Sequence, residues 1–400
     1  MGKNPMRHEE YDVVVVGGGP AGAMAAKAAA EKGAKVILLE RDPVIGTPVR
    51  CGEGVGVYNI QKYITIDPRW IAAELNRVIL YAPDGTPVEV HGEQKSGGVG
   101  GAILERCLFD RALAEAAAQS GAEICTRSDV EGLITENGTV TGVKYSRFKK
   151  SYTIKTKMVV GADGVESRVG RWAGIQTQIF DTDLESTYSK VLSGIDYDWK
   201  YAHFWVGSEV APGGYIWVFP KGPHTANVGI GVEVRLAPAA TAYKKLDAFI
   251  KKQFGNPAVV GEYAGGVPCA LPLKKPYANG IILAGDAARH CNPLTGGGIY
   301  TAMVSGFSAG TLAAEGVAIG NTTPSFLKKF DDLITEDITI PHKRAYKLAN
   351  AVRNLSDDMM NRAAKEVLSL PQDQRTMRNI FMKGLMHDPR LVVDIIRAFL

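Results

Sequence analysis

Three glycines near the N-terminus have a spacing that suits a diphosphate group. They form Gly17-x-Gly19-x-x-Gly22 between a run of four valines and an alanine-rich segment. The first glycine can make a tight turn, the second lets the backbone approach a pyrophosphate closely, and the third lets a helix touch a strand. The helix N-terminus adds N–H donors and a positive dipole. Glu40 stands where a carboxylate accepts hydrogen bonds from an adenosine ribose, so these residues predict dinucleotide binding rather than a structural turn.

Two aspartates follow apolar runs that are typical of buried strands. Asp286 ends the stretch 281–286, and Asp163 lies in Gly161-Ala162-Asp163-Gly164. A carboxylate at the end of a buried strand is costly unless it finds donors, and ligand hydroxyl groups are donors. The alternative for Asp286 is an N-cap on the next helix. For Asp163 the alternative is a purely structural Asp-Gly turn.

Two weak acids lie in stretches that could border a reaction site. Cys51 belongs to the segment 41–54, whose prolines and glycines predict a long loop. Tyr215 belongs to a strand in which Tyr215, Trp217 and Phe219 share one face. The thiol and the phenol could each donate a proton, although both are weak acids near neutral pH. The alternatives are a small buried filler for Cys51 and an aromatic sheet core for the stripe.

Buried strands and amphipathic helices must position these residues. We expect buried strands at 12–16, 35–39, 158–160 and 281–284, and helices at 21–31, 103–118 and 301–318. Further strands are expected at 122–125, 130–134 and 140–145, and a hairpin at 78–81 and 87–91 around Asp84-Gly85. From about residue 325 onward the apolar periodicity is helical.

The predicted fold class is α/β plus β. Segments 1–75, 100–180 and 270–320 form a Rossmann-like domain for the dinucleotide, assembled from separated pieces because its buried strands recur far apart. Residues 76–99 and 181–269 carry alternating aromatic strands and repeated glycines, and they form a mainly antiparallel β domain for the substrate. Residues 321–400 form a C-terminal helical region.

Composition narrows the class of protein. The 400 residues are 46% apolar and 22% charged, as in globular proteins with a large core. No apolar run reaches the roughly 18 residues of a spanning helix, and residues 1–10 lack a signal-peptide core, so we expect a cytoplasmic protein. Five scattered cysteines without C-x-x-C argue against metal and iron–sulfur sites, while one local disulfide stays open. A net charge of +4 indicates no nucleic-acid role.

Positive charge is concentrated near the C-terminus. Residues 341–400 contain 11 Lys and Arg against 6 Asp and Glu, a net charge of +5. This pattern is typical either of a solvated basic helical face or of attraction to anionic lipid. With the apolar residues at 391–393, 395–396 and 399–400, it leads us to predict peripheral contact with the cytoplasmic membrane face.

The three strand-to-turn motifs, at Gly17 to Gly22, Gly161 to Gly164 and Gly285-Asp286, resemble the FAD-binding set of the p-hydroxybenzoate hydroxylase superfamily. A narrower resemblance rests on Gly214 to Lys221, with Gly229-Ile230-Gly231 seven residues later, which is similar to the Tyr-x-Trp-x-Phe-Pro signature of geranylgeranyl reductases. The Cys-Gly loop at 51–54 and the stretches 286–289 and 293–299 place the archaeal prenyl-ether-lipid reductases nearest. The resemblance runs from about residue 10 to 310.

This resemblance implies roles for residues at matching positions. Asp286 would hydrogen-bond the ribityl–phosphate region of FAD, Arg106 would lie near its diphosphate, and the Val130 backbone would contact adenine. Backbone groups at five positions would contact the flavin: Cys51, Gly52, Gly54, Gly298 and Ile299. Tyr215, Trp217 and Phe219 would line the wall for substrate and flavin, and Arg289 and His290 could meet a substrate phosphate. A surface arginine is the alternative for Arg106.

The implied activity is FAD-dependent saturation of geranylgeranyl chains on archaeal glycerol-ether phospholipids, by hydride from reduced flavin plus a proton. No second strand-glycine-helix fingerprint is present for a nicotinamide, so the external electron donor would be NAD(P)H bound transiently, ferredoxin or a reduced deazaflavin. The alternatives are a flavin monooxygenase that hydroxylates a small aromatic and a flavoprotein electron carrier to quinone. A chlorophyll-pathway geranylgeranyl reductase is a further alternative within the first class.

Overall fold

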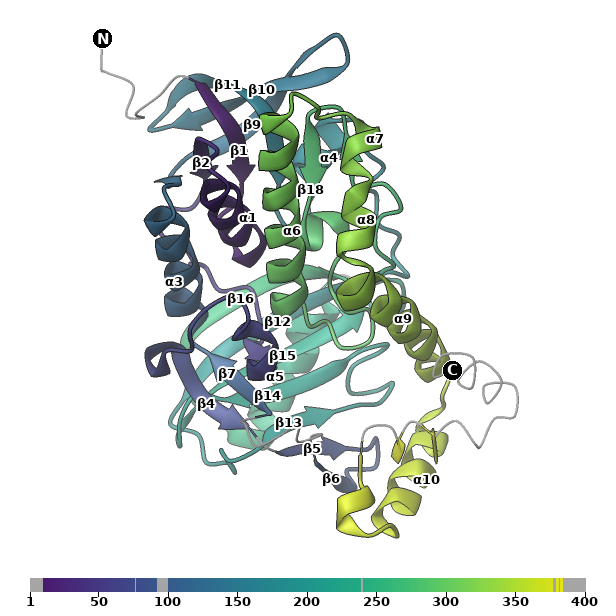
Figure 1. Ribbon diagram of the computed structural model, residues 1–400. Helices are drawn as coiled ribbons and strands as arrows, with labels where there is room; N and C mark the ends of the chain where they lie inside the picture. Colours follow the sequence, from purple (N-terminus) through teal and green to yellow (C-terminus); the bar gives the residue numbers. More distant parts are fainter. Residues whose placement is uncertain are drawn as a thin grey trace.

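The computed structural model describes residues 10–75, 77–91, 100–238, 240–376, 379–380 and 382–383. It consists of two sheets and a C-terminal group of helices (Figure 1). The strands of the first half are β1 (Glu10–Val16), β2 (Val36–Leu39), β3 (Gly54–Val55), β4 (Ile71–Leu75), β5 (Arg77–Tyr81), β6 (Pro87–His91), β7 (Gly101–Leu104), β8 (Glu123–Cys125), β9 (Asp129–Glu136), β10 (Thr139–Arg147) and β11 (Lys150–Gly161). Those of the second half are β12 (Leu184–Ser193), β13 (Ala202–Trp205), β14 (Tyr215–Pro220), β15 (Thr225–Glu233), β16 (Ala258–Pro268), β17 (Tyr277–Ala278) and β18 (Ile281–Leu283). The helices are α1 (Pro20–Glu31), α2 (Val57–Ile60), α3 (Arg106–Gln119), α4 (Arg168–Trp172), α5 (Thr241–Phe254), α6 (Ile299–Ala318), α7 (Pro324–Leu327), α8 (Lys329–Leu333), α9 (Ile340–Arg353) and α10 (Asp357–Leu368).

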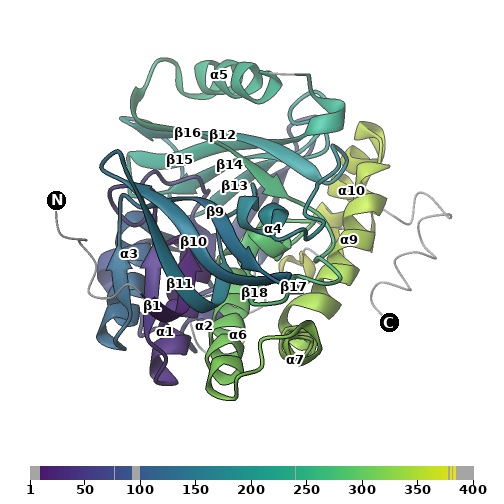
Figure 2. The ribbon, with the colours of Figure 1, turned by 90° about the horizontal axis from the view of Figure 1, so that it is seen from above.

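The first sheet is built around the valine strand β1. Its order is β17-β18-β11-β1-β2-β8, and β10 and β9 extend it beyond β11. Val13 and Val15 pack into the core beneath α1 and α6, whereas Val14 and Val16 pack into the core formed with β9 and β10. Figure 2 shows α1 and α6 on one side of β1, and β9 and β10 on the other. β1 is therefore buried on both faces, as predicted for a parallel strand flanked by parallel neighbours.

Helices α1 and α6 lie in close contact along this sheet. A Cβ atom on Gly306 would stand 2.1 Å from the Ala21 carbonyl oxygen, and one on Gly310 would stand 2.1 Å from that of Ala25. Since no side chain fits there, the glycines of α6 let the two backbones touch. This contact brings the N-terminus of α6 beside the glycine turn before α1.

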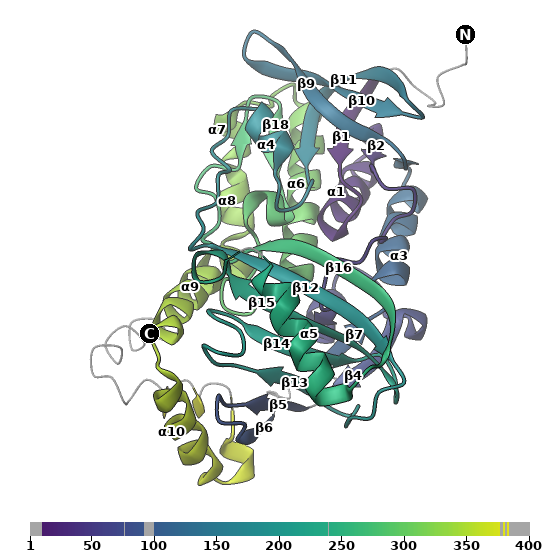
Figure 3. The same cartoon turned by 180° about the vertical axis from the view of Figure 1, so that it is seen from behind.

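The second sheet has the order β16-β12-β15-β14-β13-β5-β6, and α5 packs across its outer face (Figure 3). The predicted hairpin of β5 and β6 is present, with Arg77 opposite His91 in antiparallel register, and β5 pairs in parallel with β13. Residues 77–91 thus join the strands that follow residue 183, although about a hundred residues separate them. The sequence pattern did not indicate α5, whose Ala242, Leu246 and Ile250 face the core.

One prediction about local structure is wrong. Ile103 and Leu104 belong to β7, which pairs with β3 and β4, and the helix begins only at Arg106. Ala102 to Leu104 form a short apolar run, and such a run fits the periodicity of a helix as well as that of a strand. The strand partners, which are remote in sequence, decide between the two.

Between residues 324 and 368 the chain is mainly helical, as predicted, through α7, α8, α9 and α10. The apolar positions 391–400 that we associated with a membrane surface lie outside the described residues. Among the helices that are described, none combines the length and the apolar character needed to cross a bilayer.

Candidate active site

A cavity of about 1260 Å³ connects the first sheet, the second sheet and the C-terminal helices. One part of its wall comes from the glycine turn and the Asp286 turn, and another from the inner face of the second sheet. The far part is lined by apolar residues of β5, β6 and α10 together with α9, namely Val78, Leu80, Val88, Ala349, Val352, Met360, Ala363 and Ala364. The cavity is thus polar near α1 and apolar farther away.

The glycine turn has the geometry that its spacing predicts. Gly17 has a φ of +102°, and a Cβ atom there would lie 2.3 Å from the Ala162 carbonyl oxygen. A Cβ atom on Gly22 would lie 1.8 Å from the Gly17 carbonyl oxygen, so α1 could not meet the turn with any side chain at this position. Gly19, by contrast, has no atom within 4 Å of its Cβ position and lies on the cavity wall. This open space at a helix N-terminus is a cradle for a diphosphate.

Glu40 directly follows β2 and lies beside this turn. Its carboxylate accepts hydrogen bonds from the Gly18 N–H at 2.6 Å and the Asp42 N–H at 2.8 Å. The Ser128 N–H donates to the Glu40 backbone oxygen at 2.7 Å, which brings the start of β9 to the same place. Val130, 5% exposed on β9, is buried there and is not part of the cavity wall. The residues predicted for the adenosine end are therefore close together but lie outside the main cavity.

Asp286 projects from a short 3₁₀ turn, Gly285–Ala288, onto the cavity wall. Burial raises the pKa of its carboxyl to about 6, and the Arg106 guanidinium opposes this rise. A Cβ atom on Gly298, at the start of α6, would lie 3.3 Å from Asp286 Oδ1, so Gly298 leaves space beside the carboxylate. Ile299 lines the cavity at the next position. Asp286 does not cap a helix, which leaves its oxygens available to ligand donors.

Asp163 has a local structural role. Its Oδ2 accepts a hydrogen bond from the Val169 N–H at 2.9 Å within α4, and only its neighbours Ala162 and Gly164 reach the cavity. Of the two readings of this Asp-Gly turn, the geometry favours the structural one.

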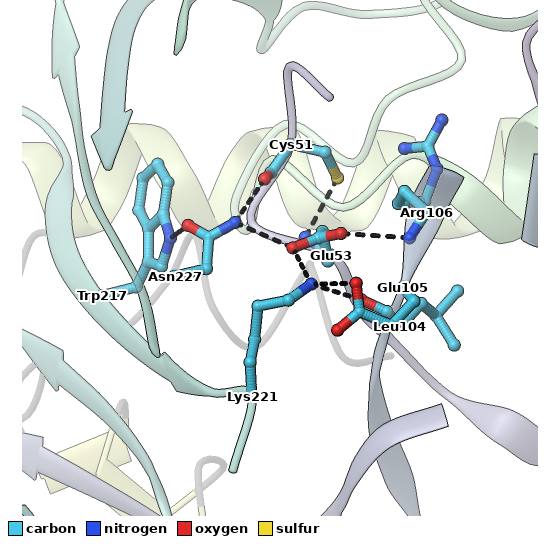
Figure 4. Close-up of polar contacts among 8 residues, drawn as sticks. All are labelled: Cys51, Glu53, Leu104, Glu105, Arg106, Trp217, Lys221 and Asn227. Atoms are coloured by element: carbon cyan, nitrogen blue, oxygen red, sulfur yellow. Dashed lines mark hydrogen bonds and ion pairs between the residues drawn. The ribbon is translucent and has the colours of Figure 1, made fainter. Parts of the chain in front are cut away.

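Polar contacts shown in Figure 4 attach the Cys51 loop to the second sheet. Asn227 Nδ2 donates to the Cys51 carbonyl oxygen at 2.8 Å and to Glu53 Oε2 at 3.1 Å, while its Oδ1 accepts from Trp217 Nε1 at 3.0 Å. Lys221 Nζ lies 2.7 Å from Glu53 Oε2, and both side chains are nearly buried. Gly52 and Gly54 are thereby held against Phe219.

The same network reaches the first sheet through α3. The Arg106 N–H donates to Glu53 Oε1 at 3.0 Å, and its guanidinium forms two hydrogen bonds of 2.7 Å with the Asp110 carboxylate. The Arg106 side chain is only 16% exposed and borders the cavity, so it is not a surface arginine. Lys221 also contacts Glu105 Oε2 at 3.0 Å. The Glu53 carboxylate thus accepts contacts from Asn227, Lys221 and the Arg106 N–H, and the Glu53 backbone has a φ of +71°.

The two predicted proton donors both border the cavity. Burial raises the pKa of the Cys51 thiol, although the nearby Arg106 guanidinium lowers it, and burial raises that of the Tyr215 phenol well above its usual range. The Tyr215 hydroxyl donates to the Thr295 carbonyl oxygen. All five cysteines, each in the described part of the chain, are free thiols. Neither group is made more acidic by its surroundings.

The aromatic face of β14 forms a wall of the cavity. Tyr215, Trp217 and Phe219 all line it, while Ile216 and Val218 face the opposite core beneath α5. A Cβ atom on Gly229 would lie 2.1 Å from the Trp217 ring, so only a glycine at this position leaves room for the indole. Phe204 of β13 packs edge-on against Tyr215 and Phe219, with centroids 5.4 and 5.2 Å away. The stripe is a cavity wall rather than a closed sheet core.

The structure does not support a phosphate contact by Arg289 or His290. His290 is completely buried against Phe330, and the Arg289 side chain donates to the Gln178 carbonyl oxygen. Neither residue is part of the cavity wall. The turn that presents Asp286 to the cavity directs the next side chains away from it.

Sequence reasoning missed several residues of the site. Asn227 and Lys221 hold the Cys51 loop, Glu185 of β12 lines the cavity, and α9 and α10 form its far part. A glutamate in a strand is usually exposed, so its type alone gives no signal. Only the pairing of β12 with β15 and β16 turns Glu185 inward.

These residues fit FAD. The open space at Gly19 suits its diphosphate, the Glu40 carboxylate lies where a ribose belongs, and Asp286 offers acceptors in the cavity. The aromatic wall and the Cys51 loop enclose the remaining space beside Asp286.

Comparisons with known proteins agree with this geometry. A family model described as the geranylgeranyl reductase catalytic domain matches residues 183–267, and one of FAD-dependent oxidoreductases matches residues 12–191. The digeranylgeranylglycerophospholipid reductase of Methanosarcina acetivorans is 45% identical, with 96% of this chain and 95% of the relative covered. Digeranylgeranylglycerophospholipid reductase 2 of Methanococcoides burtonii is 38% identical, with 97% and 95% covered. The crystal structure of a geranylgeranyl bacteriochlorophyll reductase-like protein from Thermoplasma acidophilum has a TM-score of 0.91 at 35% identity, covering 98% of this chain and 99% of that one.

Proposed function

The chain belongs to the family of digeranylgeranylglycerophospholipid reductases, FAD-dependent oxidoreductases that act on carbon–carbon double bonds, and from this membership we propose its substrate and its partners. The substrate is a glycerol-ether phospholipid that carries geranylgeranyl chains, and the product is the lipid with saturated chains. One observation carries this proposal: a single cavity joins the FAD residues Gly19 and Asp286 to an aromatic wall and to a long apolar extension.

Each part of the cavity contributes to the reaction. Bound FAD supplies a hydride in its reduced form. The wall of Tyr215, Trp217 and Phe219 positions the flat double bond and excludes water. The hydrogen bonds of Asn227 and the ion pair of Lys221 with Glu53 hold the Cys51 loop against that wall. The apolar surfaces of β5, β6 and α10 hold the part of the chain that is not reacting.

The test uses purified protein with its FAD chemically reduced under anaerobic conditions. Addition of digeranylgeranylglyceryl phospholipid should reoxidise the flavin, and mass spectra should show the lipid gaining two hydrogens for each bond reduced. Unchanged lipid beside reduced flavin would contradict the proposal. Flavin oxidation by a phenol, with oxygen entering the product, would instead indicate a monooxygenase.

We also propose that the electron donor is external, namely NAD(P)H bound transiently, ferredoxin or a reduced deazaflavin. FAD would occupy the glycine turn, and the sequence contains no second strand-glycine-helix fingerprint. Stopped-flow measurements of FAD reduction by each donor would distinguish them. A nicotinamide donor that competes with FAD for the glycine turn, seen as loss of FAD from the protein when the donor is added, would contradict the assignment.

A further inference from the structure

Glu185 is a carboxyl group inside the cavity to which none of the preceding functions has been assigned. Its side chain is 7% exposed, and it lines the cavity together with Thr187 and Ser189, the next two inward positions on β12. A Cβ atom on Gly231 would lie 2.7 Å from Glu185 Oε2, so the carboxylate lies directly over this glycine. Gly231 pairs with Tyr215 across the neighbouring strands, which places the carboxylate beside the aromatic wall.

The surroundings of Glu185 keep its proton available. Burial raises the pKa of the carboxyl to about 7, and the carboxylate of Glu233 on β15 adds to this rise. A hydrogen bond with the Cys269 thiol and the charge of Arg353 on α9 oppose it. Arg353 interacts with both glutamates, because its Nε also lies 3.2 Å from Glu233 Oε2. Burial raises the pKa values of Cys51 and Tyr215, and the Asp286 carboxyl, with a pKa of about 6, lies among the residues that fit FAD. Glu185 is therefore the remaining acid in the cavity whose pKa is matched to neutral pH.

We propose that Glu185 is the catalytic acid that delivers the proton to the double bond. This rests on the proposed lipid reduction. An isolated isoprenoid double bond has no carbonyl group to polarise it, and an acid at the alkene is therefore required when hydride arrives. Tyr215, by contrast, points its hydroxyl at the Thr295 carbonyl oxygen and acts in positioning.

The π bond breaks, one carbon takes the hydride of the reduced flavin, and the other takes the proton of the Glu185 carboxyl. Glu185 is left as a carboxylate and the flavin is oxidised. A proton from water restores the carboxyl before the next bond is reduced.

The experiment compares wild-type protein with Glu185→Gln, which keeps the shape of the side chain and removes the acid. After chemical reduction, the rate of flavin reoxidation by digeranylgeranylglyceryl phospholipid should fall about 100-fold or more, as for loss of a general acid. The wild-type rate should decline above about pH 7, whereas the residual rate of the variant should lack this decline. Flavin content and lipid binding should stay at wild-type levels.

A matched control is Glu262→Gln, which alters a glutamate on neighbouring β16 that is 51% exposed and lies beside Lys190 at the outer surface. It should leave the rate unchanged. An independent readout is infrared difference titration of flavin-free protein, in which wild type should show a carboxyl band titrating near pH 7 that Glu185→Gln lacks. If Glu185→Gln loses its flavin, Glu185→Asp, which keeps the acid on a shorter arm, should retain measurable reduction with the same decline at high pH.

The outcomes separate the two proposals. If wild type reduces no lipid, the proposed function fails. If wild type reduces lipid and Glu185→Gln does so at the same rate, the assignment of Glu185 is overturned. It is also overturned if Glu185→Gln is slow but keeps the wild-type pH profile, because the titrating group would then be another residue.

Discussion

Individual glycines make the space in which the cofactor and the side chains of the cavity lie. Gly22 lets α1 meet the turn, Gly229 accepts the ring of Trp217, and Gly231 accepts the carboxylate of Glu185. At each of these positions a methyl group would stand within 3 Å of another atom, closer than atoms pack in proteins. The glycines therefore act by the room they leave as much as by backbone freedom.

Substitution Gly22→Ala should abolish flavin binding. The added methyl group would overlap the Gly17 carbonyl oxygen, and α1 must shift at a cost of about 1–3 kcal/mol or more. The measurement is the ratio of flavin to protein absorbance after purification. Gly132→Ala is the matched control, because nothing lies within 4 Å of its Cβ position, and it should keep full flavin content. Equal flavin in both variants would contradict the geometry of the turn.

Lys221→Met should destabilise the protein by about 3–5 kcal/mol, because it leaves the buried Glu53 carboxylate without its cation. Burial lowers the pKa of Lys221, but the nearby Glu53 carboxylate raises it overall. A raised lysine pKa means that the pair stabilises the fold at neutral pH and loses this effect only as pH rises above about 10.5. Urea unfolding at pH 7 and pH 11 measures both effects.

The control for this prediction is Lys190→Met. Lys190 pairs with Asp247 and Glu262, which are 35% and 51% exposed, so water can solvate the remaining carboxylates. The cost should be about 0–1 kcal/mol. A similar loss of stability for both lysine substitutions would show that the buried Lys221–Glu53 pair does not hold the Cys51 loop in place.

Glu185 should make stability depend on pH. Its pKa is about 7 in the folded protein and about 4.3 when unfolded, so the folded state binds the proton more tightly. Wild type should therefore lose about 3–4 kcal/mol relative to Glu185→Gln as pH rises from 4 to 8. Urea unfolding of the flavin-free proteins at several pH values tests this, and a difference that is constant with pH would contradict it.

Among the elements, α9 and α10 complete the cavity from a distance in sequence. Ala364 of α10 packs in one cluster with Val88 of β6, and Ala363 also lines the cavity, so small side chains at these two positions keep its apolar end open. Figure 3 shows α10 beside the hairpin of β5 and β6. Under the proposed function, we expect the length of the lipid chain that fits to be set where these two elements meet.

Ala364→Phe should shorten the apolar end. The apparent KM for a lipid with geranylgeranyl chains should rise about tenfold, in keeping with an overpacking cost of about 1–3 kcal/mol, whereas a lipid with chains one isoprene unit shorter should be reduced as before. The control is Arg362→Phe, which lies on the exposed side of the same helix and should change the apparent KM for neither lipid. Equal losses for both chain lengths would place the chain end elsewhere.

On the scale of the whole molecule, charge is unevenly distributed. Residues 341–400 carry a net charge of +5, and within α9 the side chains of Lys343, Arg344 and Lys347 are exposed. The substrate is a membrane lipid under the proposed function, and α9 also borders the cavity through Ala349 and Val352. We propose that this basic surface meets anionic lipid near the route by which substrate enters.

Replacement of Lys343, Arg344 and Lys347 by Gln should weaken co-sedimentation with anionic vesicles at least tenfold, because each charge contributes about 1 kcal/mol near such a surface. The control replaces Lys244, Lys251 and Lys252, exposed on α5 at the outer face of the second sheet. It has the same change in net charge and should keep binding. Equal loss in both variants would mean that only net charge matters.

Local sequence determined the glycine turn, the buried valine strand, the Asp286 turn and the aromatic face of β14. Each of these depends on residues a few positions apart, whose spacing sets turn geometry and the side of a strand on which a side chain lies. Tertiary structure alone decided that Ile103 and Leu104 form a strand, that Glu185 and Asn227 face the site, and that α10 closes the far end of the cavity. These depend on strand pairing and packing between segments that are far apart in the sequence, and no local pattern records such partners.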